Sequence, residues 1–268
     1  MPGVGRSCVF FHAHPDDEAL LTAGTMARLA ARGRRVVLVV ATAGERGLAA
    51  PAPGGNGLGD RRMAELHRSA GLLGCARVVC LGYGDSGLDG SAVAQPGESQ
   101  PFASADVEQA AVRLSEVLVE ERAQLVTGYD AAGGYGHPDH LQVHRVAARA
   151  ASLAGTPALL EATVDRDLLL RVLRLVSTVY RFPPDFDRAA FEHAYTPAHH
   201  ITHRVDVRRF AAAKRASMAA HVSQTGGGDG VRTLAALLRL PVPLFRWVLG
   251  TEWYVRRDPA AAAPVAAG

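Results

Sequence analysis

Apolar runs of strand length alternate along the chain with segments whose apolar residues recur at helical spacing. Residues 35–41 (RVVLVVA) form a continuous β-branched run, which is typical of a strand buried on both faces of a parallel sheet. Strands are also predicted over 7–11, 78–81, 125–127, 159–163 and 201–207, and helices over 18–31, 60–73, 106–121, 139–151 and 208–220. This alternation predicts βαβ units, and therefore an α/β protein with a Rossmann-like, mostly parallel sheet and helices on both faces.

Two polar segments interrupt the alternation. Residues 42–59 are rich in Gly, Pro and Ala, which predicts a mobile loop ahead of a helix capped by Asp60, and residues 85–102 predict a second Gly-rich loop. The chain shows no internal repeat and no firm boundary, which predicts a single domain over 1–258. The Ala-rich segment 259–268 is expected to be a disordered tail.

Composition narrows the class of protein. The 268 residues are 48% hydrophobic and 21% charged with a formal net charge of +3, as is ordinary for a soluble globular protein. No block of basic residues interleaved with aromatics is present, and no signal segment or run of about 18 apolar residues, which argues against nucleic-acid and membrane partners. Cys8, Cys75 and Cys80 lie in or beside apolar segments and cannot all pair, which predicts reduced core thiols in a cytoplasmic protein. The sequence leaves a homo-oligomer open.

A polar cluster follows the first predicted strand. In an open parallel sheet, ligands bind outside the carboxyl ends of the strands, and here the strand runs into His14, Pro15, Asp16, Asp17 and Glu18. His14 and Asp17 are metal-ligand types, and three adjacent carboxylates repel one another unless a cation or a helix N-terminus offsets their charge. A helix start with a capping Asp would also explain the acids, but the preceding histidines favour a metal site. Asp16 lies between the two ligands and is free to act as a base.

A second polar cluster follows the strand predicted over 125–127. Its members are Tyr135, His137, Asp139, His140 and, one helical turn later, His144. The three histidines all remain open as the third ligand. His140 and His144 would share a helix face as in zinc-binding helices, but Leu141 stands where such helices carry a glutamate. Two histidines and a carboxylate suit catalytic Zn²⁺ and also the Fe²⁺ of non-haem oxygenases.

Together, Ala13-His14-Pro15-Asp16-Asp17-Glu18 and His137-Pro138-Asp139-His140 resemble the paired motifs of the LmbE-like (PIG-L) family of metal-dependent N-deacetylases. The similarity extends from about residue 7 to 254 and is weakest over 153–199. It is strongest to the branch that holds the N-acetylglucosaminyl-inositol deacetylase of mycothiol biosynthesis and the mycothiol S-conjugate amidase. The resemblance implies an LmbE-like fold and a zinc-dependent amide hydrolase. Its substrate would be a small N-acetylglucosamine-type conjugate of mycothiol or natural-product biosynthesis, and its products acetate and the free amine.

The resemblance also implies a role for each matched residue. It makes His14, Asp17 and His140 the metal ligands, Asp16 the general base, His137 and Tyr135 the groups at the substrate carbonyl, and Arg62, Asp85 and His221 substrate contacts, with His221 near the pocket rim. Asp139 would orient the neighbouring histidine, and a carboxylate partner would raise the pKa of His137 and favour its imidazolium. The alternatives are a solvated helix arginine for Arg62, a turn aspartate for Asp85 and a helix cap for Asp139.

The residue types predict the chemistry. A metal lowers the pKa of a water molecule and polarises the acetyl carbonyl, Asp16 takes the proton of the water, and protonated His137 and the Tyr135 hydroxyl stabilise the oxyanion. Either Asp16 or His137 could protonate the leaving amine. An amidase acting on a mycothiol S-conjugate or a related natural-product thiol adduct is the main alternative. A non-haem iron oxygenase fits less well, because it would leave Asp16 without a task and usually has a β-rich barrel.

Overall fold

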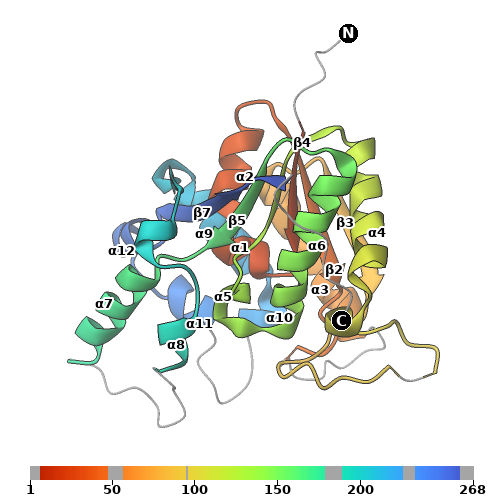
Figure 1. Ribbon diagram of the computed structural model, residues 1–268. Coiled ribbons are helices and arrows are strands. Elements are labelled where there is room, and N and C mark those ends of the chain that lie inside the picture. The colour runs from red at the N-terminus through yellow and green to blue at the C-terminus, as the bar shows by residue number, and fades with distance from the viewer. Residues whose placement is uncertain (1–6, 48–56, 95, 179–188, 226–232, 260–268) are drawn as a thin grey trace.

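The structure is a computed structural model that describes residues 7–47, 57–94, 96–178, 189–225 and 233–259. Within these residues seven strands form one sheet in the order β3-β2-β1-β4-β5-β7-β6 (Figure 1). The parallel part consists of β1 (Ser7–His12), β2 (Arg35–Thr42), β3 (Arg77–Tyr83), β4 (Ala123–Tyr129) and β5 (Leu159–Thr163). Strand β7 (Thr251–Arg257) is antiparallel to both of its neighbours, β5 and β6 (His203–Asp206). The predicted α/β fold with a mostly parallel sheet is therefore confirmed.

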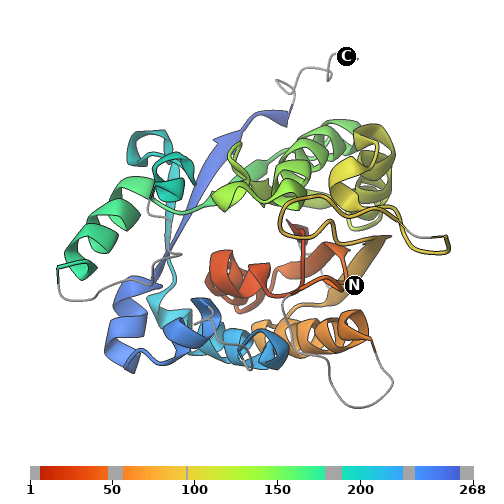
Figure 2. The same cartoon turned by 90° about the horizontal axis from the view of Figure 1, so that it is seen from below.

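Helices cover both faces of this sheet, as the alternation predicted (Figure 2). On one face lie α4 (Val107–Glu120) and α6 (Pro138–Ala154), and on the other α2 (Ala23–Ala30) and α3 (Leu58–Leu73). Successive side chains of a strand point to opposite faces of the sheet. Val9 and Phe11 of β1 therefore pack in the core beneath α4 and α6, and Cys8 and Phe10 pack in the core beneath α2 and α3. Burial of β1 on both faces explains its apolar sequence.

Shorter elements complete the described chain. The remaining helices are α1 (Asp17–Leu21), α5 (Gly133–Gly136), α7 (Arg166–Val176), α8 (Ala190–His193), α9 (Ala211–Ala220), α10 (Val222–Thr225), α11 (Thr233–Leu238) and α12 (Val242–Val248). Three 3₁₀ turns span Phe102–Ser104, Ala198–His200 and Arg208–Phe210.

Several predicted elements differ from the observed ones. The helix predicted over 18–31 is two helices, because Thr22 ends α1 and precedes α2 with non-helical backbone angles. Asp60 was predicted to cap its helix, but α3 begins earlier, with Gly57 at the cap position and Asp60 in the first turn. Helix α7 and strand β7 were not predicted. The β-type run Trp253–Val255 was a signal for β7, but its partner β5 lies far away in the sequence.

Two further predictions concern the cysteines and the segments expected to be mobile. Cys8 is buried and Cys75 half-buried, but Cys80 is exposed, so the prediction of a core thiol is wrong for Cys80. Residues 48–56 of the predicted mobile loop and residues 260–268 of the predicted tail lie outside the described residues. Over the described ranges, each helix is either too short or too polar to span a bilayer.

The strand order places the two polar motifs side by side. Strands β2 and β3 extend the sheet on one side of β1, while β4 and β5 extend it on the other, so the order reverses between β1 and β4. Ligand sites of open α/β sheets lie at the carboxyl ends of the strands at such a point. The first motif follows β1 and the second follows β4, which brings both to this position.

Candidate metal centre and active site

The turn after β1 has a strained backbone at Asp16. Its φ of 111° and ψ of −26° lie in a region that a residue with a Cβ seldom adopts, at a cost of about 1–3 kcal/mol. Although Asp16 precedes α1, its side chain makes no capping hydrogen bond to that helix. The interpretation of Asp16 as an ordinary helix cap is therefore excluded. Strain of this kind is typical of functional sites.

Asp17 lies between two histidines that come from the two motifs. Its Oδ2 atom is 3.4 Å from His14 Nδ1, and its Oδ1 atom is 3.4 Å from His140 Nε2. The backbone N–H of His14 also donates to Asp17 Oδ2, at 2.9 Å, which fixes this carboxylate. All three side chains are buried or nearly so. The structure thus brings together the three residues predicted to be metal ligands.

The donor set fits a divalent cation. His140 Nε2 is buried and has no hydrogen-bond partner among the described residues, although it faces the Asp17 carboxylate. His14, His137 and His140 offer nitrogen atoms that lie within 4.8 Å of one another. A cation would satisfy these nitrogens, and imidazole with carboxylate is the usual donor set of catalytic zinc. Asp17 is not a member of this histidine group, but its carboxylate oxygens lie 3.4 Å from His14 Nδ1 and from His140 Nε2, so it is placed to complete a zinc site with these two histidines.

Two carboxylates lie beside the Nε2 atom of His14. Its Nε2 atom lies 3.0 Å from Asp139 Oδ2 and 3.7 Å from Asp85 Oδ1, and these atoms form a second metal-capable group with His14. Backbone N–H groups bond to both carboxylates: Ser86 N–H donates to Asp139 Oδ2, and Arg46 N–H and Gly87 N–H donate to the two oxygens of Asp85. Asp139 Oδ1 is buried and has no hydrogen-bond partner among the described residues. Burial lowers the pKa of His14, but the bonds to Asp139 and Asp17 outweigh it and raise the pKa to about 10. Asp139 and Asp85 therefore orient His14, with its Nδ1 atom turned toward Asp17.

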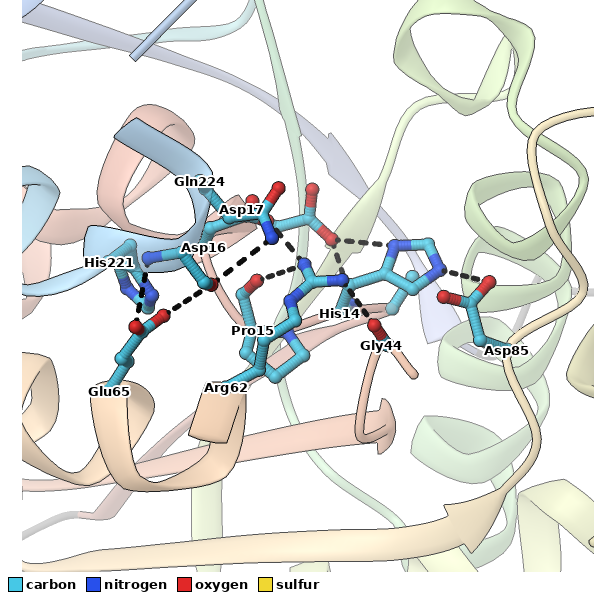
Figure 3. A network of polar contacts seen from close by, with 12 residues as sticks. His14, Pro15, Asp16, Asp17, Gly44, Arg62, Glu65, Asp85, His221 and Gln224 are labelled. Atoms are coloured by element: carbon cyan, nitrogen blue, oxygen red, sulfur yellow. Dashed lines mark hydrogen bonds and ion pairs between the residues drawn. The ribbon is translucent and has the colours of Figure 1, made fainter. Parts of the chain in front are cut away.

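Arg62 lies beneath Asp16 and joins two loops (Figure 3). Its Nη1 donates to Gly44 O and its Nη2 to Pro15 O, both at 2.6 Å, and Nη2 is 3.4 Å from Asp16 Oδ2. Burial raises the pKa of Asp16 to about 6, and the Arg62 guanidinium acts against this increase. The predicted sugar contact of Arg62 stays a prediction, because its buried side chain contacts the backbone and Asp16 in this structure.

His137 has an unexpected protonation state. Its Nδ1 atom accepts the backbone N–H of Asp139 at 3.1 Å, so a neutral ring carries its proton on Nε2. Burial, together with the neighbouring His14 and His140, lowers the pKa of His137 to about 4. The Asp139 carboxylate raises the pKa of His137, as expected, but burial and the two histidines outweigh it, so the imidazolium of His137 is not favoured. The hydrogen bond of Asp139 goes to His14.

Tyr135 extends over the two histidines of its own motif. Its side chain is 53% exposed, and its ring centre lies 6.0 Å from that of His137 and 5.1 Å from that of His140. The preceding Gly134 has a φ of 65° and a ψ of −105°, angles that favour glycine. A Cβ on Gly134 would lie 3.3 Å from the Tyr195 ring. The chain conformation that presents Tyr135 therefore depends on glycine.

Two other histidines lie apart from the predicted metal ligands. His221 was expected near the pocket rim, but it is fully buried, with Nε2 2.6 Å from Glu18 Oε1. His144, left open as a third ligand, points away from the metal group: its Nδ1 lies 3.1 Å from Tyr129 O and 3.0 Å from Glu161 Oε1. Neither residue belongs to a metal-capable group in the described part of the chain.

Sequence reasoning missed two residues of the site. Tyr129, at the end of β4, packs against His140 with ring centres 4.5 Å apart and the rings tilted by 45°, and its hydroxyl lies 2.9 Å from His12 Nδ1. Glu18 accepts hydrogen bonds from three parts of the chain, among them the backbone N–H of Asp16. The signal for Glu18 was its place as the third acid of the motif, and for Tyr129 its place at a strand end.

This chain is similar to known proteins along most of its length. The family model described as PIG-L, GlcNAc-PI de-N-acetylase, matches residues 9–151. A 1D-myo-inositol 2-acetamido-2-deoxy-alpha-D-glucopyranoside deacetylase of Streptomyces scabiei is 38% identical over 94% of this chain and 84% of its own. The deacetylase of the same name from Thermomonospora curvata is 33% identical over 100% of this chain and 96% of its own.

Among solved structures, the N,N'-diacetylchitobiose deacetylase from Pyrococcus horikoshii superposes with a TM-score of 0.61 at 18% identity, covering 97% of this chain and 87% of that one. At this identity the likeness establishes the fold alone. The family match covers more than half of the chain, and the curated relatives are similar over nearly all of it. The chain therefore belongs to the PIG-L family of de-N-acetylases.

Proposed function

We propose that this chain is a zinc-dependent N-deacetylase that hydrolyses the acetyl amide of an N-acetylglucosaminyl-inositol, releasing acetate and the free amine. The observation that carries the proposal is the position of Asp17 between His14 and His140, with Asp16 directly beside it. The printed names of the curated relatives describe deacetylases of a 2-acetamido sugar joined to myo-inositol, which supports the substrate class. The three free thiols suit the reducing cytoplasm.

His14, Asp17 and His140 would hold the zinc ion. When bound, zinc polarises the acetyl carbonyl and lowers the pKa of a water molecule. Asp139 and Asp85 keep the His14 ring in place through its Nε2 atom. This support leaves Asp16, His137 and Tyr135 to act on the substrate.

Asp16 acts as the general base. Its pKa of about 6 lies close to neutral pH, where a carboxylate can both accept a proton and return it. One Asp16 oxygen takes the proton of the attacking water, and the same group then delivers this proton to the leaving amine. His137 is the weaker donor candidate for the amine, because its pKa of about 4 leaves it neutral.

His137 and Tyr135 stabilise the developing oxyanion. Since His137 Nδ1 accepts a backbone N–H, the neutral ring donates from Nε2, and a fixed neutral donor needs no proton uptake during turnover. Desolvation of the hydroxyl, together with the nearby Asp17 and Asp16 carboxylates, raises the pKa of Tyr135 well above its ordinary value, so the hydroxyl stays protonated and able to donate. Its exposed position suits a group that reaches the substrate from the solvent side.

The test is amine release from a panel of substrates by the zinc-loaded protein, with a metal-stripped sample as the control. The panel holds N-acetylglucosaminyl-inositol, N-acetylglucosaminyl conjugates with other aglycones, and a mycothiol S-conjugate. Release from the acetylated inositol sugar, lost on stripping and restored by zinc, supports the proposal. Cleavage of the S-conjugate alone would replace the deacetylase by an amidase. No release from any substrate by metal-loaded protein would overturn the proposal.

A further inference from the structure

The side chain of Glu18 lies fully buried behind Asp16. Its Oε2 atom accepts the backbone N–H of Asp16 at 3.0 Å. Its Oε1 atom accepts the hydroxyl of Ser69, on α3, at 2.6 Å, and lies 2.6 Å from Nε2 of His221, which follows α9. One carboxylate therefore joins the backbone of Asp16 to two other elements of the fold.

These contacts explain how Asp16 keeps an unfavourable backbone conformation. A residue with a Cβ seldom stays at a φ of 111° unless its surroundings hold it there. The Asp16 carbonyl accepts the N–H of Ala19 at 3.1 Å, and its own N–H is held by Glu18. Glu18 cannot easily turn away, because Ser69 and His221 fix its other oxygen inside the core.

We propose that Glu18 is a positioning residue that holds the strained backbone of Asp16 and so directs the Asp16 carboxylate toward the reacting water. The inference rests on the proposed function, since it assigns Glu18 a part in the work of the proposed base. The direction of a Cα–Cβ bond depends on the backbone angles, so relaxation of φ at Asp16 would turn its carboxylate away from the pocket. An error of about 1 Å in a catalytic group can cost about 100-fold in rate.

A purely structural role is the competing explanation. Glu18 also links α1 to α3 and α9, so its loss could lower stability without any specific effect on Asp16. Glu65 provides a matched control: it is a buried glutamate on α3 that accepts the backbone N–H and the hydroxyl of Ser223, at 2.9 and 2.6 Å. It thus secures the segment that follows His221.

The experiment compares Glu18→Met, Glu18→Gln and Glu65→Met as zinc-loaded proteins. Glu18→Met removes every acceptor at similar size and is expected to lower kcat by about 10- to 100-fold, with zinc content unchanged. Glu18→Gln retains one acceptor oxygen and is expected to recover part of this loss. Glu65→Met is expected to lower the melting temperature while kcat stays within about two-fold.

A double-mutant cycle with Asp16→Asn separates the two roles. If Glu18 acts through Asp16, Glu18→Met costs less than about two-fold in the Asp16→Asn background. An equal loss in both backgrounds, or an equal loss of kcat in Glu65→Met, would overturn the inference. If Glu18→Met does not fold, the cycle is run with Glu18→Gln.

A crystal structure of Glu18→Met gives a readout that does not depend on enzymatic activity. The φ of residue 16 is expected to leave the positive region once its N–H loses the Glu18 acceptor. An unchanged φ would overturn the inference even if the wild-type protein is a deacetylase. A wild-type protein without deacetylase activity would overturn only the proposed function, since the change in φ could still be observed.

Discussion

His14 Nε2 lies 3.0 Å from Asp139 Oδ2, although 125 residues separate the two in the sequence. Asp139 comes from the start of α6, which follows β4, and His14 comes from the turn after β1. This contact therefore joins the two polar motifs at the point where the strand order reverses. A histidine that binds metal through one ring nitrogen usually donates a hydrogen bond from the other. The contact thus leaves His14 Nδ1 available on the side of Asp17.

Replacing Asp139 tests this support. Asp139→Asn removes the charge that faces His14, and we expect zinc affinity to fall by about 10- to 100-fold, as for other groups that orient metal-binding histidines. Competition with a chelator measures the affinity. Asp106→Asn, which alters an exposed helix cap distant in sequence from both motifs, is the control. Equal zinc affinities of wild type and Asp139→Asn would contradict the assigned role.

The metal ligands and the base should separate by metal content. His140→Ala and Asp17→Asn each remove one predicted ligand, so we expect loss of both bound zinc and amine release. Asp16→Asn should keep zinc at wild-type content while turnover falls by at least about 100-fold, because a positioned base contributes about 10²–10⁴-fold. Zinc content is measured by elemental analysis of dialysed protein. Zinc loss in Asp16→Asn would mean that Asp16 is a ligand.

The pH dependence of kcat/KM should report Asp16. Because burial raises its pKa to about 6, the base becomes protonated below this pH and activity should fall on the acid side with a midpoint near 6. Arg62→Gln removes the positive charge 3.4 Å from Asp16, which favours the protonated acid and moves the midpoint to higher pH. Arg62→Lys, which keeps the charge, should move it less. A midpoint that moves to lower pH in Arg62→Gln would contradict the assignment.

Gly134 should be sensitive to a single added methyl group. Gly134→Ala places a Cβ at a φ of 65° and 3.3 Å from the Tyr195 ring, so the turn that presents Tyr135 has to change. We expect kcat/KM to fall by about 10-fold or more, since small displacements of catalytic groups are costly. Gly71→Ala in α3, where a Cβ meets open space, should leave activity unchanged and stabilise the helix by about 1 kcal/mol. Equal activity of both variants would exclude a role for this turn.

His144 predicts a pH-dependent contribution to stability. Burial lowers its pKa, but the ion pair with Glu161 outweighs burial and raises the pKa above the ordinary value of 6.5. A raised folded-state pKa adds stability that is complete below about pH 6.5 and is lost as the pH rises through the folded-state pKa. The difference in unfolding free energy between wild type and His144→Gln should therefore be larger at pH 6 than at pH 9. Denaturant unfolding at both pH values measures it, and a difference that grows with pH would contradict the ion pair.

Local patterns along the chain are enough to predict the class of fold and the position of the two polar motifs. Periodic apolar runs specify strands and helices locally, and each polar motif directly follows a predicted strand, so the parallel sheet brings both to one edge. The break between α1 and α2 at Thr22 and the antiparallel strand β7 were not predictable in this way. Both depend on partners far along the chain.

The pairing of each histidine with its carboxylate depends on long-range packing. Spacing left His137, His140 and His144 equivalent, whereas the packing of α6 against β4 and β5 places His140 beside Asp17 and His144 beside Glu161. The tautomer of His137 also depends on a neighbouring backbone N–H that no residue type reveals. Hydrogen-bond geometry and burial arise from the whole fold, and these determine the charge of each group and the atom that it presents to a ligand.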